Sequence, residues 1–306
     1  MNRPLLRSLL RLAARCFLGR ARGHYEEWFP WLRLEKPGPA VPGGIFYKSQ
    51  KCGELQPLSV LRERAGDALH IVGSGPSVKL NDLRLIPDFT AILLNGAMSL
   101  SSKEIKAPLA IAVEDERFVW RHFPMLKVVD RSIICLLSVA AIRAICQADA
   151  GWFHDRIVIL IDNVRKPYEG ARRDDGALAA LDFVRLSPAH DAGFSLSPER
   201  GVFQGGSVAV TAFQFAVACD VGTIGFFGVD ISNANSPRFY ETTADAAYSG
   251  IAAAEKRILA HVALGVAVAD ERCIKVCNFS PISSLNQCGL PYNDSFALRG
   301  AAGEAG

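Results

Sequence analysis

Short runs of consecutive hydrophobic residues recur along the chain, and most of them end in glycine, asparagine or an acidic residue. A short continuous run of this kind predicts a strand that is buried on both faces. Hydrophobic stretches of helical length follow at 208–219 and 252–264. This alternation predicts an α/β fold with a Rossmann-like, doubly wound and mostly parallel sheet. The predicted strands lie at 69–72, 91–94, 109–113, 132–137, 157–162, 223–230 and 273–279.

Polar residues stand where several of these strands end. In doubly wound sheets, ligands bind beyond the carboxyl ends of the strands. We therefore expect the binding site to be built around the strand-end residues Ser74, Ser77, Asn95, Asp115, Asp230 and Asn278.

The first predicted strand runs into the turn Gly73-Ser74-Gly75-Pro76-Ser77. Its two glycines permit positive φ and a close approach of backbone N–H groups to an anion. Pro76 suits a first helical turn, and the Ser77 hydroxyl adds a donor near a helix N-terminus. The third glycine of a dinucleotide fingerprint is missing. The turn predicts a phosphate-binding loop, with a tight structural turn as the alternative.

Asn95 and Asp115 follow the second and third strands. The Asn95 amide both donates and accepts hydrogen bonds, which suits a base or a ribose. Asp115 is a candidate for holding a sugar hydroxyl or for acting as a base. The neighbouring Glu114 and Glu116 are either metal ligands or solvated charges. Solvated charges are the commoner arrangement at a strand end, so we expect no metal here.

Gly205, Gly206 and Ser207 open the helix that starts at 208 and offer a second set of N–H and hydroxyl donors. Further on, Arg238 suits a bidentate phosphate contact, and Tyr240 is near enough in sequence to reach the same oxygens. The alternative for this stretch is a solvated surface loop. No Gly-x-Ser-x-Gly elbow occurs, which leaves a hydrolase without support.

The N-terminal region has its own pattern. Residues 1–22 contain six arginines and no acidic residue, and the arginines at 3, 7, 11 and 15 share one helical face. This favours a basic amphipathic helix on an anionic membrane surface over a signal peptide, whose hydrophobic core is unbroken. An ordinary helix packed on the domain is the remaining alternative. Prolines between 35 and 44 predict a linker, so we divide the chain into a tail at 1–44 and one domain at 45–300, with a lid at 163–203.

Composition narrows the class of protein. The 306 residues carry a net charge of +3, which is too small for a protein that works on nucleic acid. Without residues 1–22, 28 basic residues face 31 acidic ones. No uncharged hydrophobic run reaches the roughly 20 residues of a membrane span. The eight cysteines form no CxxC pair, so we expect reduced thiols and no metal site.

Over most of residues 55–295 the chain resembles the Kdo transferases of the lipopolysaccharide core, the enzymes that add a third Kdo to the inner core. It is more distantly similar to bacterial sialyltransferases that use CMP-sialic acid. The most specific shared motif is Pro237-Arg238-Phe239-Tyr240, and the glycine turn is the least specific. The other matching segments are Pro57–Arg62, Leu94-Asn95-Gly96, Asp115-x-Arg117-Phe118, Thr211-Ala212-x-Gln214 and Gly228-x-Asp230.

The resemblance implies a GT-A-like sialyltransferase-type fold and an enzyme that transfers Kdo from CMP-Kdo to a lipid-linked inner-core sugar. The partners are then a CMP-sugar donor, a lipid A/core oligosaccharide acceptor and an anionic membrane surface at residues 1–22, with no nucleic acid. The location is cytoplasmic, peripheral on the inner membrane. No cofactor is expected, and because CMP carries a single phosphate its departure needs little metal assistance.

The resemblance also assigns roles to residues. The sialyltransferases carry a histidine base after the aromatic loop, but residues 244–249 contain none. Asp115, Asp230 and Glu241 are therefore the candidate bases, and Arg238 and Tyr240 hold the leaving-group phosphate. The donor is expected to contact Gly73, Ser74, Gly75, Pro76, Ser77, Asn95, Gly206 and Ser207.

Three alternatives remain. One is a sialyltransferase-like transfer of another nonulosonic acid to a surface glycan, and another is a non-catalytic nucleotide-binding membrane module. A Rossmann oxidoreductase is disfavoured, because the second strand ends in Asn95 where such enzymes place an acidic residue.

Overall fold

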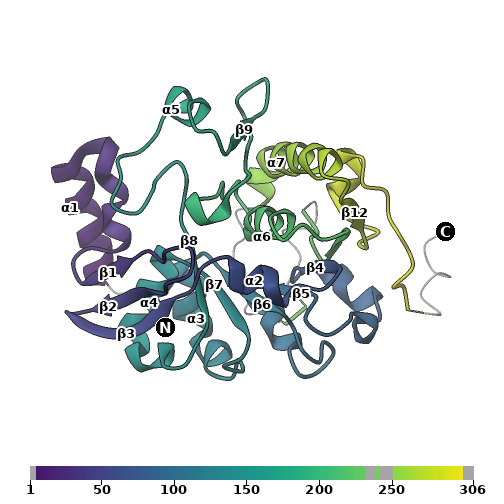
Figure 1. Cartoon of the computed structure of the whole chain (residues 1–306), viewed down its shortest axis with the longest axis horizontal. Coiled ribbons are helices and arrows are strands. Elements are labelled where there is room, and N and C mark those ends of the chain that lie inside the picture. Colours follow the sequence, from purple (N-terminus) through teal and green to yellow (C-terminus); the bar gives the residue numbers. More distant parts are fainter. Residues whose placement is uncertain (1–4, 232–238, 241–250, 299–306) are drawn as a thin grey trace.

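The computed structural model describes residues 5–231, 239–240 and 251–298. A ten-stranded sheet runs through the protein in the order β1-β2-β3-β8-β7-β6-β5-β4-β11-β12 (Figure 1). Strands β3 to β12 of this order pair in parallel, and β1 and β2 add an antiparallel edge. The mostly parallel α/β sheet predicted from the sequence is confirmed.

All of the strands of this sheet are short, and the central ones are brief hydrophobic runs. Their bounds are β1 Leu32–Glu35, β2 Gly43–Tyr47, β3 Gln50–Leu55, β4 Ala68–Val72, β5 Ala91–Leu94, β6 Ala110–Val113, β7 Ile134–Ser138, β8 Val158–Ile161, β11 Thr223–Phe227 and β12 Lys275–Asn278. Strands β5, β6, β7 and β8 are buried at every position. Burial on both faces explains why their sequences do not alternate between hydrophobic and polar residues.

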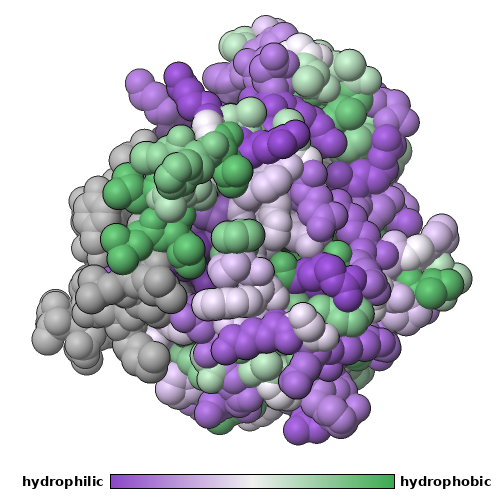
Figure 2. Space-filling model, turned by 90° about the vertical axis from the view of Figure 1, so that its left-hand side faces the viewer, coloured by the Kyte–Doolittle hydropathy of each residue, from purple (hydrophilic) through white to green (hydrophobic). Residues whose placement is uncertain are grey.

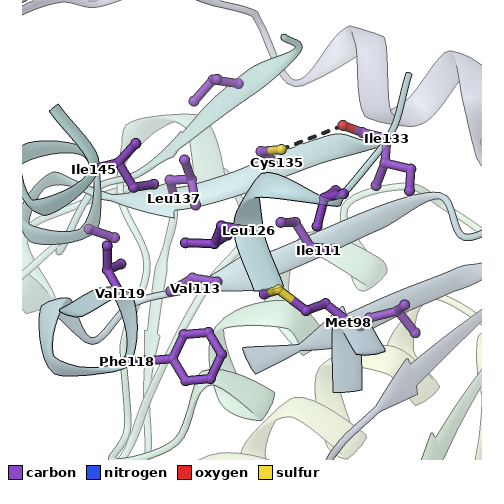
Figure 3. Packing of buried hydrophobic residues seen from close by; sticks show 14 of the residues in the cluster. Met98, Ile111, Val113, Phe118, Val119, Leu126, Ile133, Cys135, Leu137 and Ile145 are labelled. Atoms are coloured by element: carbon purple, nitrogen blue, oxygen red, sulfur yellow. Dashed lines mark hydrogen bonds between the residues drawn. The ribbon is translucent and has the colours of Figure 1, made fainter. Parts of the chain in front are cut away.

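Helices cover both faces of the sheet. Alternate strand residues point to opposite sides, so Ile111 and Val113 of β6 pack with α3 Glu116–Lys127 and α4 Val139–Asp149. Figure 3 shows this side of the core, where Cys135 and Leu137 of β7 meet the same helices. The other face packs against α2 Ser59–Arg64, α6 Val208–Val217 and α7 Ile251–Glu271.

The direction in which strands are added reverses at β4. After β4, the chain builds β5, β6, β7 and β8 on one side, and it returns to place β11 and β12 on the other. The strands β4 and β11 are neighbours, but the chain continues from them toward opposite sides of the sheet. Such a topological switch point leaves a crevice at the carboxyl ends of the strands, which is where ligands bind in folds of this type.

The N-terminal residues are part of this fold. The prolines expected in a linker lie in the connection between β1 and β2, and both strands belong to the main sheet. The boundary predicted at residue 44 therefore falls inside the sheet and is corrected. Helix α1 spans Leu5–Arg22 with a non-helical Gly19, and Figure 1 shows it beside the β1–β3 end of the sheet. That this helix meets a membrane stays a prediction.

Residues 163–203 form a separate layer with their own small core. They contain α5 Asp175–Ala179 and a two-stranded sheet of β9 Val184–Leu186 and β10 Gly193–Ser195. The side chains of Val164, Leu178, Phe183, Val184 and Phe203 pack together beneath them. Movement of this segment as a lid stays a prediction.

Gln214 of α6 explains how this segment is held. Its side-chain oxygen accepts the N–H groups of Ser195 and Phe203, both at 3.0 Å, and its amide donates to the carbonyls of Phe203 and Val210. All four hydrogen-bonding positions of a fully buried amide are thus used. One glutamine anchors the end of the 163–203 segment to the main domain.

Candidate functional site

A cavity of about 800 Å³ opens at the carboxyl ends of β4, β5, β6 and β11. Its walls come from the loops after these four strands, from the start of α6, from the inner side of α7 and from residues 163–172. Of the predicted donor-binding residues it brings together Gly73, Ser74, Gly75, Pro76, Asn95, Gly206 and Ser207, and it adds the candidate bases Asp115 and Asp230.

The glycines of the first turn serve a different purpose from the one predicted. Gly73 and Gly75 lie outside the positive-φ region, which corrects the expectation that they supply that conformation. Their N–H groups donate to the carbonyls of Phe227 and Gly228, at 2.7 and 2.8 Å. A Cβ on Gly73 would lie 2.4 Å from the Gly228 oxygen. The two glycines are required because the loops after β4 and β11 touch backbone to backbone.

Asp230 and Ser77 lock these loops together. The Asp230 carboxylate accepts the Ser77 N–H at 2.8 Å, the Ser77 hydroxyl at 2.5 Å and the Ser280 hydroxyl at 2.5 Å. All three side chains are buried. The arrangement makes Asp230 a brace between loops and uses the Ser77 donors that the sequence assigned to phosphate. Sequence reasoning missed this pairing because the residues lie 153 positions apart.

Glu114, directly after β6, is a carboxylic acid in the cavity wall. Its Oε1 accepts a hydrogen bond from the Thr211 hydroxyl of α6, and Oε2 has no partner among the described residues. Burial, assisted by the neighbouring charge of Asp115, raises the pKa of Glu114 to about 8. A carboxyl group with this pKa exchanges a proton near neutral pH. From the sequence, Glu114 was predicted to be a solvated charge, with a metal ligand as the less favoured alternative, although its position at a strand end was visible.

Asp115 has a more conventional environment. It is the N-cap of α3, where its Oδ1 accepts the Arg117 N–H at 2.8 Å, and its carboxylate forms an ion pair with the Arg117 guanidinium at 3.0 Å. Both side chains face the cavity. The cap and the ion pair keep Asp115 in place while leaving it partly exposed.

Asn95 sits at the end of β5 in a left-handed conformation, with φ of 47°. Asparagine tolerates this region better than most residues. Its side-chain oxygen is buried and has no hydrogen-bond partner in the described part of the chain. Because buried amide oxygens are normally paired, Asn95 is a candidate ligand contact in the cavity wall.

The cavity also carries positive charge that sequence reasoning did not assign to the site. Arg165 pairs with Asp175 at 2.6 Å, and Arg257 of α7 donates to the Gly205 carbonyl at 3.2 Å. Lys166 and Arg172 line the cavity and have no ion-pair partner among the described residues. These side chains come from the predicted lid and from α7, so only the tertiary fold places them opposite the glycine turn.

The start of α6, where the sequence predicts a second set of donors, lies in the cavity wall. Gly205 and Gly206 have φ of 57° and 101°, a conformation that favours glycine. A Cβ on Gly206 would lie 2.7 Å from the Arg257 guanidinium. The Ser207 hydroxyl is the N-cap of α6 and accepts the Ala209 N–H. The N-terminus of α6 therefore points its positive end into the cavity.

His261 of α7 is a further cavity residue that the sequence left without a role. Its Nδ1 lies 2.8 Å from the Arg257 carbonyl, which can only accept, so Nδ1 carries the proton and Nε2 is the free acceptor. Burial lowers the pKa of His261 below its usual value. The imidazole is therefore neutral at pH 7.

The aromatic motif is described only in part. Arg238 and Glu241 lie outside the described residues. The Tyr240 ring packs against Gly96, where a Cβ would come within 1.9 Å of it, and meets the His122 ring edge-on at 5.8 Å. The Phe239 N–H donates to the Ser74 carbonyl at 3.3 Å. Of the described part of the motif, Phe239 thus contacts the glycine turn and Tyr240 contacts the residue after Asn95.

Within the described ranges, no three His, Cys, Asp or Glu side chains gather in a way that would hold a metal ion. No helix there combines the length and the hydrophobicity needed to cross a bilayer.

Comparisons with known proteins find only remote structural likenesses. No family model matches the chain, and none of the curated protein sequences does. Among solved structures, the chain is similar to a point mutant of the α-2,3/8-sialyltransferase CstII, with 14% identity over 74% of this chain and 86% of that chain and a TM-score of 0.40. It is also similar to CstII from Campylobacter jejuni in complex with the substrate analogue CMP-3FNeuAc, with 14% identity, coverage of 76% and 87%, and a TM-score of 0.39. These likenesses do not identify the activity of this chain.

Proposed function

We propose that this protein is a glycosyltransferase that uses a CMP-activated sugar, and that it transfers Kdo from CMP-Kdo to a lipid-linked inner-core sugar. The observation that carries the proposal is the cavity at the switch point, where a glycine turn and the start of α6 face cationic side chains. The sequence motifs shared with Kdo transferases support the choice of donor and acceptor. The proposal places the enzyme on the cytoplasmic side of the inner membrane.

The donor phosphate is assigned to the cationic part of the cavity. Lys166 and Arg172 are without ion-pair partners among the described residues, and the N-terminus of α6 adds its dipole. Asn95, with its unpartnered oxygen, is assigned to the cytosine or the ribose. A monophosphate leaving group carries less charge than a pyrophosphate, and these cations offset that charge as it departs. We therefore propose that transfer needs no metal ion.

Glu114 is the proposed proton acceptor. The acceptor hydroxyl oxygen attacks the anomeric carbon of Kdo, the bond from this carbon to the CMP phosphate oxygen breaks, and CMP leaves with the bonding electrons. The hydroxyl proton passes to the Glu114 carboxylate. Thr211 holds one oxygen of this carboxylate, and we assign the other oxygen to the acceptor hydroxyl. A base with a pKa near the working pH is the most efficient proton acceptor.

The first test is nucleotide binding in the absence of metal. Thermal stabilisation and calorimetric titration with CMP, CDP, UDP and NAD are expected to show preference for CMP. A Lys166→Ala/Arg172→Ala variant should bind CMP about tenfold more weakly or worse, because charge-assisted hydrogen bonds are lost. Arg131→Ala, an exposed arginine outside the cavity, is the matched control. Preference for UDP or NAD would overturn the proposal.

The second test is transfer itself. Purified protein is incubated with CMP-Kdo or CMP-sialic acid and a lipid-linked inner-core acceptor, and the product is followed by mass spectrometry. Transfer of Kdo alone supports the proposal in full. Transfer of sialic acid instead would support the proposed glycosyltransferase activity and reject CMP-Kdo as its donor. CMP-sugar binding without turnover of either donor would favour the non-catalytic module and reject the enzyme.

A further inference from the structure

A surface helix of a soluble domain usually packs its apolar side against the core. Helix α1 instead turns a charged residue inward. Arg7 points inward and is only 2% exposed. Its guanidinium forms ion pairs with Glu26 at 2.5 Å and with Glu116 of α3 at 3.3 Å, and Arg143 of α4 pairs with the same Glu116. Arg7, one of the arginines expected to meet a membrane, is therefore buried and fixes α1 to the domain. We call Arg7 with Glu26 and Glu116 the Arg7 clamp. Breaking a buried pair is costly, so the clamp defines which face of α1 points outward.

Several apolar side chains of α1 are exposed. Leu9 and Leu12, three positions apart and thus on one face, are 64% and 62% exposed. At the end of the helix, Phe17 is 87% exposed and Leu18 is also exposed, and Phe29 adds an exposed ring just beyond. Figure 2 views the molecule from this side and shows hydrophobic side chains gathered on it beside polar ones. We call Leu9, Leu12, Phe17, Leu18 and Phe29 the α1 face.

An exposed apolar group of this kind marks an interaction surface. Its surroundings match an anionic bilayer: besides the buried Arg7, the first 22 residues carry five arginines and no acid, and Arg20 and Arg22 lie exposed close in sequence to Phe17 and Leu18. Trp31, also exposed, has the Lys48 ammonium 5.5 Å from its ring centre, which places an aromatic and a cation together as at a headgroup boundary. Apolar side chains that insert among the lipids and arginines that lie near anionic headgroups both contribute to the binding of a protein to a bilayer.

The α1 face is joined to the cavity rim. The Arg172 N–H donates to the Ala21 carbonyl at 2.9 Å, and the Tyr25 hydroxyl donates to the Glu169 carbonyl at 3.1 Å. His24 Nε2 lies 3.2 Å from the Pro167 carbonyl. These hydrogen bonds attach the residues that follow Gly19 to the cavity-lining segment at 165–172.

We propose that the α1 face docks on an anionic bilayer and holds the rim of the cavity at the level of the lipid headgroups. The contact surface is apolar and is framed by arginines, while the Arg7 clamp transmits its orientation to the domain. This docking does not depend on the reaction in the cavity. If the proposed transfer is correct, the same orientation brings the cavity to a lipid-linked acceptor.

Vesicle flotation tests the proposal with the full chain. Wild-type protein should float with phosphatidylglycerol-containing vesicles and much less with pure phosphatidylcholine, and high salt should weaken binding. A Leu9→Asp/Phe17→Asp variant should lose at least about tenfold in partitioning, because two buried apolar contacts are replaced by charges that the headgroups repel. Leu85→Asp/Val128→Asp is the matched control, with side chains 57% and 84% exposed elsewhere on the surface.

Thermal melting establishes that both double variants are folded, which is expected because all four side chains are exposed. Equal flotation of Leu9→Asp/Phe17→Asp and wild type overturns the proposal. Failure of the wild-type protein to float with anionic vesicles overturns it as well. A wild-type dimer in light scattering that becomes a monomer in Leu9→Asp/Phe17→Asp assigns the face to a second copy and also overturns it. CMP binding is measured on the same variants, so failure of docking and failure of the proposed function are told apart.

Discussion

The Asp230 carboxylate accepts both the N–H and the hydroxyl of Ser77, at 2.8 and 2.5 Å, across the switch point of the sheet. One residue follows β11 and the other follows β4, strands that pair in parallel. These two hydrogen bonds therefore hold together the two loops that form part of the cavity wall. It also leaves the carboxylate committed to donors inside the protein.

Replacing Asp230 with alanine should destabilise the protein. Ser77 and Ser280 would lose their acceptor while remaining buried, and unpaired buried donors cost about 1–3 kcal/mol. We expect a decrease of about 2–4 kcal/mol in the free energy of unfolding, measured by urea denaturation. Ser280→Ala, which removes one of the three bonds, should cost about 1 kcal/mol. Wild-type stability in Asp230→Ala would show that the brace does not matter.

Gly75→Ala should force apart the two loops. The new Cβ would lie 2.4 Å from an Asp230 carboxylate oxygen and 2.7 Å from the Gly228 carbonyl oxygen, and the second is backbone that cannot rotate away. Overpacking of this kind costs about 1–3 kcal/mol, and CMP affinity should fall with it. Gly222→Ala is the control, because its Cβ would meet nothing closer than 3.6 Å. Identical melting and CMP binding of the two variants would contradict the argument.

Glu114 should set the pH dependence of transfer. A base must be ionised to accept a proton, so kcat/KM should rise with pH up to the pKa of Glu114, about 8, and then level. Glu114→Gln should lower kcat/KM by about 10²–10⁴-fold and abolish this rise. Asp115→Asn keeps the α3 cap but removes a charge that raises the pKa of Glu114, so the rise should move to lower pH.

The position of that rise also identifies the base. If His261 accepts the proton, the midpoint lies below the usual histidine pKa of 6.5, because burial lowers the pKa of its imidazole. A midpoint near 8 that persists in Glu114→Gln would exclude Glu114. Wild-type pH–rate profiles with CMP-Kdo, repeated in His261→Ala, settle the choice.

His70 should make the fold sensitive to acid. It lies in β4 against the Phe227 and Phe296 rings, with ring centroids 5.5 and 5.7 Å away, and burial lowers its pKa to about 4. The unfolded chain, with a histidine pKa near 6.5, binds more protons between pH 4 and 6.5. Stability from this residue is therefore complete above pH 6.5 and is lost as the pH falls through about 4.

His70→Leu keeps a similar volume and removes the titrating group. Urea unfolding between pH 7 and pH 4 should show a shallower loss of stability for His70→Leu than for wild type. Parallel curves for the two proteins would mean that other groups cause the acid sensitivity.

The sequence determined the strands β4 to β8, β11 and β12, and through them the edge of the sheet where the cavity lies, but not β1, β2 and β3. Consecutive hydrophobic residues at 91–94 or 110–113 leave no polar face, so these segments must be buried on both sides of a parallel sheet. The residues that follow, Asn95 and Glu114 among them, then have to gather at one edge. This much depends only on local pattern and on the direction of parallel strands.

Only the tertiary structure decided what each polar residue does. Ser77 and Asp230 looked like ligand contacts until the fold paired them, and Gly73 and Gly75 looked like phosphate-loop glycines until β11 came within backbone contact. The orientation of α1 was equally hidden, because the arginine and leucine pattern is compatible with either face inward. It was fixed by Glu116, a residue 109 positions from Arg7. Pairing energies between distant residues leave no periodicity in the sequence, and for that reason pattern alone located the site but not the roles within it.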